Sequence, residues 1–349
     1  MGRGVAQLCA QSGFLVLLYD AVPEALGKAK SRLREALSSG VQKGKLSAGE
    51  ADAAEARVAC TESLEGLADA KIVVEAAPEE LPLKQRLFVA LDRITAPSTV
   101  LATNTSSLLV AEIAAGVKHP DRVLGLHFFN PPVAMKLVEV ARTRATSEEA
   151  YRLAWELVVA LGKTPVAVKD TPGYVVNRVV RPFYLEAQRI AGEGRGSFRF
   201  VDQALRELGG VPMGPFELMD LIGLEVNLAI SRSIHSALGS PERLKPHFIQ
   251  ERLVESGRFG RKTRKGFYVY EGGKPVGENP EALGLLPSGQ TPTQPRYLCE
   301  RILGAVSAEA ALAAAEGVAS EADIDTAVQL AMNFPKGPLQ WRRDAAKAP

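Results

Sequence analysis

Two polar residues, His127 and Asp20, each come directly after an apolar run, at the point where a predicted strand ends. Side chains at such positions can take part in chemistry. His127 comes after the run 123–126, and open α/β sheets bind their ligands beyond the ends of their strands. An imidazole exchanges protons near neutral pH, so it can act as a general acid or base. Asp20 comes after the run 14–19, where a carboxylate can accept hydrogen bonds from an adenosine ribose. Together they indicate proton transfer beside a bound dinucleotide.

The carboxylate of Asp20 also bears on which dinucleotide would bind. An acid at this position repels a 2′-phosphate, so the sequence favours NAD over NADP. The glycine-rich turn that cradles the pyrophosphate in such sites is represented only by Met1-Gly2-Arg3-Gly4, and Gly2 is the candidate contact. An aspartate that closes a strand is more often a helix cap, so Asp20 needs support from other segments.

The residues up to Asp170 alternate between helical and strand patterns. Residues 2–12 and 24–37 have the apolar spacing of amphipathic helices, and 14–19 is a continuous apolar run of strand length. Further short apolar runs lie at 72–74, 99–103, 123–126 and 137–140. A capping box, Thr146-x-x-Glu149, opens a helix that ends at Gly162. Strands that alternate with helices predict a doubly wound α/β domain over residues 1–170.

The pattern becomes helical from Thr171 onward, and the one convincing strand is the short run 266–270. Residues 171–270 are therefore expected to form a helical domain that binds substrate or pairs subunits. A stretch rich in Gly, Pro and polar residues, 271–294, is the best candidate for a linker. Residues 295–349 contain an Ala-rich helical segment over 297–317 and are expected to form part of a second helical domain.

The two helical parts share a repeat. Asp202-x-Ala204 is followed by Pro212-Met213-Gly214-Pro215, and Asp325-x-Ala327 is followed by Pro335-Lys336-Gly337-Pro338. Each matched residue is displaced by the same number of positions, since 325−202 and 338−215 are both 123. The matched positions predict a duplicated helical unit.

Several segments read together resemble one known family, the L-3-hydroxyacyl-CoA dehydrogenases. They are 102–108 (ATNTSSL), 125–132 (GLHFFNPP), 135–139 (MKLVE), 169–178 (KDTPGYVVNR) and 259–268 (FGRKTRKGFY). The resemblance covers essentially the whole chain, and the second Pro-x-Gly-Pro unit suggests the subgroup with tandem C-terminal helical domains. It implies a Rossmann-like NAD-binding domain, followed by all-α helical domains.

The resemblance also implies roles for four residues. His127 would be the catalytic base, and Glu139 would orient its imidazole. Ser106 and Asn177 would be the polar groups around the substrate hydroxyl and the thioester carbonyl. A lone histidine is more often structural, but His127 occurs together with these three partners at the family's spacing. The other histidines do not, and they are expected to be structural or exposed: His119, His235 and His247.

The remaining implied contacts belong to the two nucleotide-containing ligands. The cofactor NAD would lie near Gly2, Asp20, Glu79, Lys84, Ser106, Asn130 and Lys262. Lys43 matches a family lysine that reaches the phosphates of CoA, although it could equally be a solvated helix lysine. Two positions depart from the family pattern: Ala36 replaces a serine that contacts CoA, and Arg264 replaces a glycine in a turn beside Lys262.

Larger departures concern the two ends of the sequence. Family members have a strand and a G-x-G-x-x turn before the position of Gly2, and the second helical domain continues beyond the position of Pro349. We therefore expect a chain truncated at both ends, in which the Rossmann-like domain lacks its first strand. Translation upstream of Met1 in the same frame tests this expectation.

Composition narrows the class of protein. The 42 Lys and Arg residues nearly balance the 40 Asp and Glu residues, so nothing favours nucleic acid as a partner. No apolar run is long enough for a bilayer, and no signal-peptide pattern is present. The three cysteines have no metal-ligand spacing and fit free thiols in the cytoplasm, so no metal is expected.

The favoured function is NAD-dependent oxidation of (S)-3-hydroxyacyl-CoA to 3-oxoacyl-CoA, in fatty-acid or aromatic-compound degradation. The small-molecule partner would be an acyl-CoA, and a homodimer is one assembly that the resemblance suggests. One alternative is a truncated, non-catalytic paralogue that binds CoA esters or partners without turnover. The other is a β-hydroxyacid dehydrogenase that acts on free acids, which would lack the HFFNP and KLVE segments.

Overall fold

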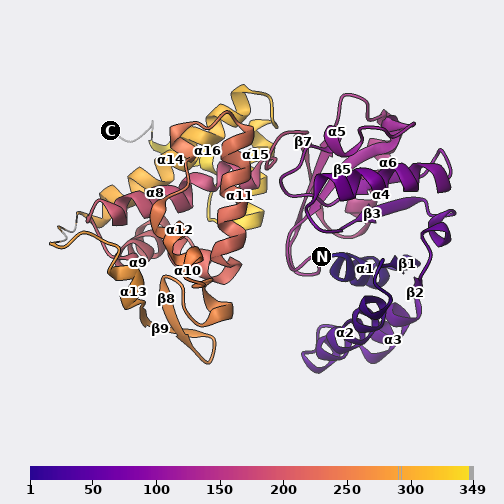
Figure 1. Cartoon of the computed structure of the whole chain (residues 1–349), viewed down its shortest axis with the longest axis horizontal. Coiled ribbons are helices and arrows are strands. Elements are labelled where there is room, and N and C mark those ends of the chain that lie inside the picture. The colour runs from indigo at the N-terminus through magenta and orange to yellow at the C-terminus, as the bar shows by residue number, and fades with distance from the viewer. Residues whose placement is uncertain (290, 292, 346–349) are drawn as a thin grey trace. The chain divides into compact units, whose positions relative to one another are not determined.

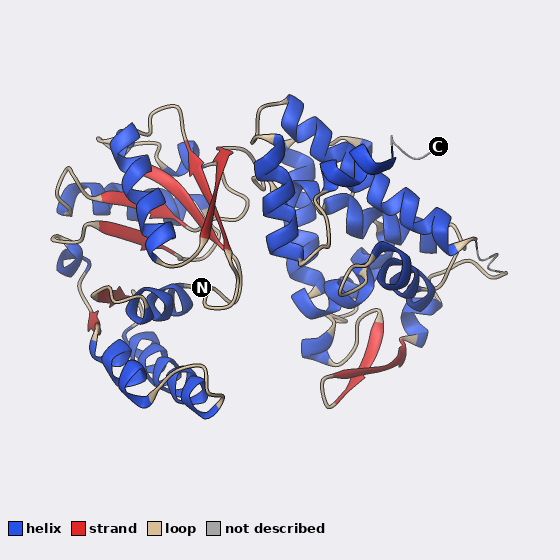
Figure 2. Cartoon of the chain, turned by 180° about the vertical axis from the view of Figure 1, so that it is seen from behind, coloured by secondary structure: helices blue, strands red, loops and turns tan. Residues whose placement is uncertain are grey.

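The computed structural model describes residues 1–289, 291 and 293–345, and the chain divides into two compact units (Figure 1). The first unit comprises Met1–Asp170, and the second begins at Thr171. Strands alternate with helices in the first unit, whereas the second is mainly helical (Figure 2). The Rossmann-like fold followed by a helical part is therefore confirmed.

The first unit contains two sheets. A parallel pair is formed by β1 (Val16–Tyr19) and β2 (Val58–Thr61). A five-stranded sheet has the order β3-β4-β5-β6-β7, with bounds Ile72–Glu75, Val100–Thr103, Val123–Phe128, Leu137–Arg142 and Thr164–Lys169. Its neighbours are parallel except for β5 and β6, which are antiparallel.

The separation of the two sheets fits the expected absence of a first strand. In the doubly wound order, the strand that precedes the first helix lies between the strands that correspond to β1 and β3. Those two strands belong to different sheets here. The β1 segment is also poorly covered, since Leu15 is 88% exposed and Leu17 is 41% exposed, whereas every residue of β4 and β5 is buried.

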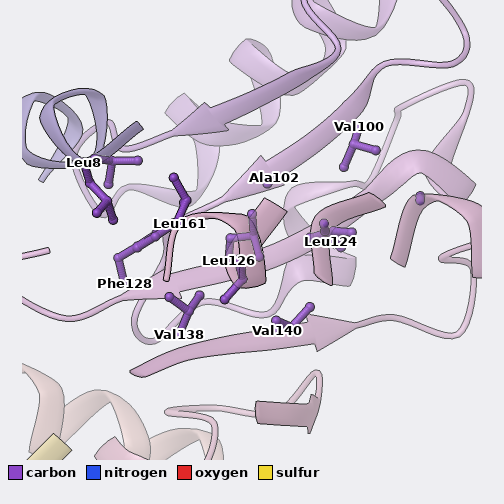
Figure 3. Packing of buried hydrophobic residues seen from close by; sticks show 13 residues of the cluster. Leu8, Val100, Ala102, Leu124, Leu126, Phe128, Val138, Val140 and Leu161 are labelled. Atoms are coloured by element: carbon purple, nitrogen blue, oxygen red, sulfur yellow. The ribbon is translucent and has the colours of Figure 1, made fainter. Parts of the chain in front are cut away.

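Helices cover the five-stranded sheet and close its core. The helices of this unit are α1 (Gly2–Gln11), α2 (Pro23–Gln42), α3 (Ala48–Ala56), α4 (Leu81–Ile94), α5 (Val110–Ile113) and α6 (Glu148–Ala160). Leu8 of α1 and Leu161, just after α6, pack with Val100, Leu126 and Val138 from three strands (Figure 3). Continuous apolar strands are what a sheet covered on both faces requires.

The predicted capping box of α6 is wrong by one residue. Ser147, not Thr146, is the N-cap, and its hydroxyl accepts a hydrogen bond from the Ala150 amide. The Thr146 hydroxyl instead donates to the Val123 carbonyl at 2.7 Å. Thr146 is therefore drawn toward the start of β5, and the cap passes to the next side chain.

The described residues of the second unit form helices and a hairpin. Its helices are α7 (Val176–Val179), α8 (Arg181–Gly192), α9 (Phe198–Gly209), α10 (Pro215–Ile222), α11 (Leu224–Ala237), α12 (Phe248–Glu255), α13 (Pro280–Leu283), α14 (Pro295–Ala315), α15 (Glu321–Met332) and α16 (Pro338–Ala345). The antiparallel hairpin pairs β8 (Tyr268–Glu271) with β9 (Lys274–Glu278). Both β9 and α13 lie in the stretch 271–294 that composition predicted as a linker. Gly272 and Gly273 supply the positive φ angles of the hairpin turn, so these glycines mark a turn.

The predicted repeat is confirmed in the second unit. The helices α9 and α10 begin at residues 198 and 215, and α15 and α16 begin at residues 321 and 338, the same displacement of 123. The Asp202 carboxylate accepts hydrogen bonds from the amides of Phe216 and Glu217 at the start of α10. Asp325 accepts in the same way from Leu339 at the start of α16. Each aspartate thus fixes the next helix of its own copy.

Candidate active site

The centre of the site is a buried pair on adjacent antiparallel strands. His127 of β5 stands directly opposite Glu139 of β6 in the strand register. The His127 Nδ1 atom lies 2.7 Å from the Glu139 Oε2 atom, and the two side chains are 7% and 0% exposed. The ring of Phe129 packs against the imidazole, with the ring centroids 4.6 Å apart.

This geometry assigns a task to each ring nitrogen. An ionised carboxylate can only accept, so Glu139 favours the tautomer with the proton on Nδ1, in which Nε2 can act as a proton acceptor. The same carboxylate can stabilise an imidazolium. The predicted partnership of His127 and Glu139 is therefore present in the structure.

Ser106 lies on the turn that follows β4, next to the strand that carries His127. The Glu79 carboxylate organises this turn, because its Oε1 atom accepts from the Ser106 amide at 2.9 Å and the Ser107 amide at 3.0 Å. The Thr105 hydroxyl donates to the same oxygen at 2.7 Å. Glu79, which the resemblance places near NAD, thus holds the turn that carries Ser106.

Two residues of the site were missed at the sequence level. The Asn104 side-chain oxygen accepts from the Phe128 amide at 2.8 Å, which joins the Ser106 turn to the end of β5. Glu75, at the end of β3, is buried and forms an ion pair of 2.7 Å with Lys84. The available signal was an acidic residue closing the apolar run 72–74, as Asp20 closes 14–19.

The start of α1 and the end of β1 carry the groups that are expected to bind a dinucleotide. Gly2 begins α1, and a Cβ atom on Gly4 would come within 3.0 Å of Pro132, so the start of the helix passes close to the loop that carries Asn130. A helix start offers amide donors to a pyrophosphate. Asp20 is exposed just after β1, and its Oδ1 atom accepts from the Val22 amide at 3.0 Å. These residues fit NAD.

The other predicted residues are more exposed or lie in the second unit. Lys43 is exposed just after α2. Asn177 is half-buried on α7, and its backbone carbonyl accepts from Arg181. Lys262 forms an ion pair with Glu225, and its ammonium lies 5.1 Å from the centroid of the Phe259 ring.

The turn beside Lys262 contains one of the departures from the family pattern, Arg264. Arg264 has a φ angle of 60°, which is the left-handed conformation that favours glycine. Its backbone carbonyl accepts from the Tyr270 amide, so the turn is tied to β8. The turn therefore forms with arginine at some cost in backbone strain.

An apolar groove of about 1050 Å³ lies on the second unit, on α14 between α9 and α16. Leu208, Cys299, Leu303 and Trp341 are among its lining residues, and none of the predicted site residues takes part. Among the helices that the structure describes, none is long and apolar enough to span a bilayer.

Comparison with known proteins decides the family. The NAD-binding domain of 3-hydroxyacyl-CoA dehydrogenase matches residues 1–171, and the C-terminal domain of the same enzyme matches 173–270 and 297–346. The chain belongs to the 3-hydroxyacyl-CoA dehydrogenase family. The C-terminal match falls on two segments, and the gap between them, residues 271–296, contains the whole of the predicted linker 271–294.

Relatives in this family resemble the chain over most of its length. It is 36% identical to a 3-hydroxyadipyl-CoA dehydrogenase of Escherichia coli over 417 aligned residues, which cover 98% of this chain and 88% of that protein. It is 42% identical to a probable 3-hydroxybutyryl-CoA dehydrogenase of Bacillus subtilis, over 78% of this chain and 94% of that one. The crystal structure of 3-hydroxybutyryl-CoA dehydrogenase from Escherichia coli superposes with a TM-score of 0.90 at 35% identity, covering 99% of this chain and 89% of that chain.

Proposed function

We propose that this chain oxidises (S)-3-hydroxyacyl-CoA to 3-oxoacyl-CoA with NAD. The observation that carries the proposal is the buried pair of His127 and Glu139, whose Nδ1 and Oε2 atoms are 2.7 Å apart. Membership of the 3-hydroxyacyl-CoA dehydrogenase family supports the same reaction. The pair is what an alcohol oxidation requires, because the hydroxyl proton must leave as hydride leaves the carbon.

The reaction divides between proton transfer and hydride transfer. The Nε2 atom of His127 takes the proton of the 3-hydroxyl group, and Glu139 stabilises the resulting imidazolium through Nδ1. NAD supplies the acceptor for the hydride from the same carbon, so the products are the ketone, NADH and a proton. Ser106 and Asn177 hold the hydroxyl and the thioester carbonyl in the orientation that this transfer requires.

The cofactor and CoA contacts follow from the same proposal. Asp20 accepts hydrogen bonds from the adenosine ribose, and the amides at the start of α1, near Gly2, receive the pyrophosphate. The rest of the proposed cofactor shell consists of Glu79, Ser106, Asn130 and Lys262. Lys43 is proposed to meet the CoA phosphates as a point charge.

The proposal also covers the cellular compartment, the pathway and the oligomeric state. It places the enzyme in the cytoplasm, in fatty-acid or aromatic-compound degradation, with a homodimer as the candidate assembly. Analytical ultracentrifugation of the 349-residue chain measures the assembly directly. A monomer at micromolar concentration contradicts the homodimer and leaves the proposed reaction in place.

The deciding experiment compares three substrates by the absorbance of NADH. Acetoacetyl-CoA should oxidise NADH, (S)-3-hydroxybutyryl-CoA should reduce NAD, and free 3-hydroxybutyrate should be turned over far more slowly. Tight binding of the CoA ester without any change in NADH would support the non-catalytic alternative. Turnover of the free acid at the rate of the thioester would support a β-hydroxyacid dehydrogenase instead.

A further inference from the structure

A buried ion pair lies behind the turn that carries Ser106. The Lys84 ammonium of α4 is 2.7 Å from the Oε1 atom of Glu75 at the end of β3, and each side chain is 1% exposed. Charged side chains are rarely buried so completely unless they are paired. We therefore ask which part of the structure the buried pair of Glu75 and Lys84 holds in place.

The hydrogen bonds of this pair are made inside the protein. Lys84 also donates to the Ala77 carbonyl at 3.2 Å. Glu75 accepts from the Ala77 amide at 2.5 Å and from the Thr103 hydroxyl at 2.7 Å. An ammonium with these partners and almost no exposed surface is not placed to meet a cofactor directly.

Lys84 also lies close to Glu79. The Lys84 nitrogen lies 3.6 Å from the Glu79 Oε2 atom, while the Oε1 atom of Glu79 receives the donors of the turn. Burial raises the pKa of Glu79, but the Thr105 hydroxyl, the Ser106 amide and the Lys84 charge outweigh it, so the pKa is lowered. Glu79 is thus an ionised acceptor that ties a buried charge to the Ser106 turn.

We propose that Glu75 is a positioning residue of the dehydrogenase site, which fixes Lys84 behind Glu79 and thereby holds the turn of Thr105, Ser106 and Ser107. Glu75 and Lys84 act through Glu79, and neither side chain touches NAD or the substrate. This assigns Lys84 a role behind the cofactor site, in place of the direct contact that the sequence suggested. The importance of the turn for catalysis rests on the function proposed above for Ser106.

The variants Glu75→Gln and Lys84→Met separate this proposal from simple loss of stability. Each should lower the amide protection factors of Ser106 and Ser107 about tenfold or more, because a charge-assisted acceptor loses its support. Hydrogen exchange followed by NMR on the protein without cofactor measures this. The control is Asp92→Asn, which breaks the buried ion pair of Asp92 with Arg122 farther along α4. It should lower the melting temperature and leave the two protection factors unchanged.

A pH series supplies the readout that a purely structural role would not move. Glu79 has a lowered pKa, so protection of the turn is retained above the ordinary pKa of a glutamate and lost as the pH falls through the folded value. Removing the Lys84 charge raises the pKa of Glu79 in the folded protein. In Lys84→Met, protection should therefore disappear at a higher pH than in the wild type, whereas Asp92→Asn should follow the wild type.

The outcomes distinguish this proposal from the proposed function. If Lys84→Met and Glu75→Gln melt earlier but keep wild-type protection at Ser106 and Ser107, Glu75 is structural and the proposal is overturned. The double variant, which removes both charges, covers the case in which single variants fail to fold, and it should also lose protection of the turn. If the turn responds as expected while the wild type shows no turnover, the proposed function fails and the positioning role stands.

Discussion

His127 and Glu139 are direct cross-strand partners on β5 and β6, the one antiparallel pair in the five-stranded sheet. The antiparallel register sets the imidazole and the carboxylate side by side, and the Nδ1 and Oε2 atoms are 2.7 Å apart. Because both side chains come from a rigid ladder, the orientation of the base does not depend on a mobile loop. The sheet itself therefore fixes the orientation of the imidazole.

Replacing Glu139 by Gln tests that organisation. The glutamine amide can offer either an oxygen or an NH₂ group to Nδ1, so the tautomer is no longer fixed and the imidazolium loses its counter-charge. We expect kcat to fall by about 10²-fold or more, with little change in NADH affinity. Steady-state kinetics and NADH fluorescence titration measure the two effects. Unchanged kcat would show that Glu139 only fills space.

Replacing Asp20 by Ser tests the choice of cofactor. The charge that repels a 2′-phosphate is removed, and so is an acceptor for the ribose hydroxyls. The KM for NAD should rise about tenfold or more, and the ratio of kcat/KM for NADP to that for NAD should increase. Kinetics with both cofactors measure the ratio. If the ratio does not move, Asp20 serves only the local turn that its bond to the Val22 amide describes.

Replacement of Gly214 tests the packing of the repeat unit, and replacement of Gly304 in α14 is the control. A Cβ on Gly214 would lie 2.3 Å from the Asp202 carboxyl carbon, so Gly214→Ala should lower the free energy of unfolding by about 1–3 kcal/mol. Gly304 lies within α14 and a Cβ there meets nothing within 4 Å, so Gly304→Ala should raise it by about 0.5–1 kcal/mol. Urea denaturation measures both. Equal effects of the two replacements would contradict the close packing of Asp202.

The stability of the second unit should depend on the protonation of Asp202. Burial raises the pKa of Asp202 from 3.8 to about 7, despite the donors from Phe216, Tyr268 and Glu217. The folded state then binds a proton that the unfolded state lacks between about pH 4 and 7, so this contribution to stability is lost as the pH rises through that window.

The matched variant for this effect is Asp202→Asn, which resembles the protonated form at every pH. The stability of the wild type relative to this variant should be greatest near pH 4 and should decrease as the pH approaches 7. Urea denaturation of both proteins across this range measures the difference. A difference that grows with pH would mean that Asp202 is ionised in the folded protein and supported by its three donors.

Long apolar runs and local motifs were predictable because they carry their own signal. The strands near residues 123–128 and 137–142 were anticipated from such runs, and the repeat around Asp202 was anticipated from its matched motifs. Strand β2 (VACT) and strand β7, which contains Pro165, were missed because neither is a continuous apolar run. Their place is set by neighbouring strands.

The same distinction between local signals and tertiary contacts applies to the residues of the candidate site. His127 and Glu139 were recognisable from motif spacing, whereas Glu75 and Asn104 gain their roles from contacts across the sheet. Lys84 shows the limit of transferring a role by motif. The motif predicts a cofactor contact for Lys84, but the burial of its ammonium depends on the residues that pack around it and follows from no spacing.

The most direct test of the central claim is the kcat of His127→Ala, measured by NADH formation from (S)-3-hydroxybutyryl-CoA, with NADH affinity measured in parallel. Loss of the base should reduce kcat by about 10²–10⁴-fold, and NADH affinity should stay near that of the wild type. A variant that keeps the turnover of the wild type would contradict the assignment of His127 as the catalytic base.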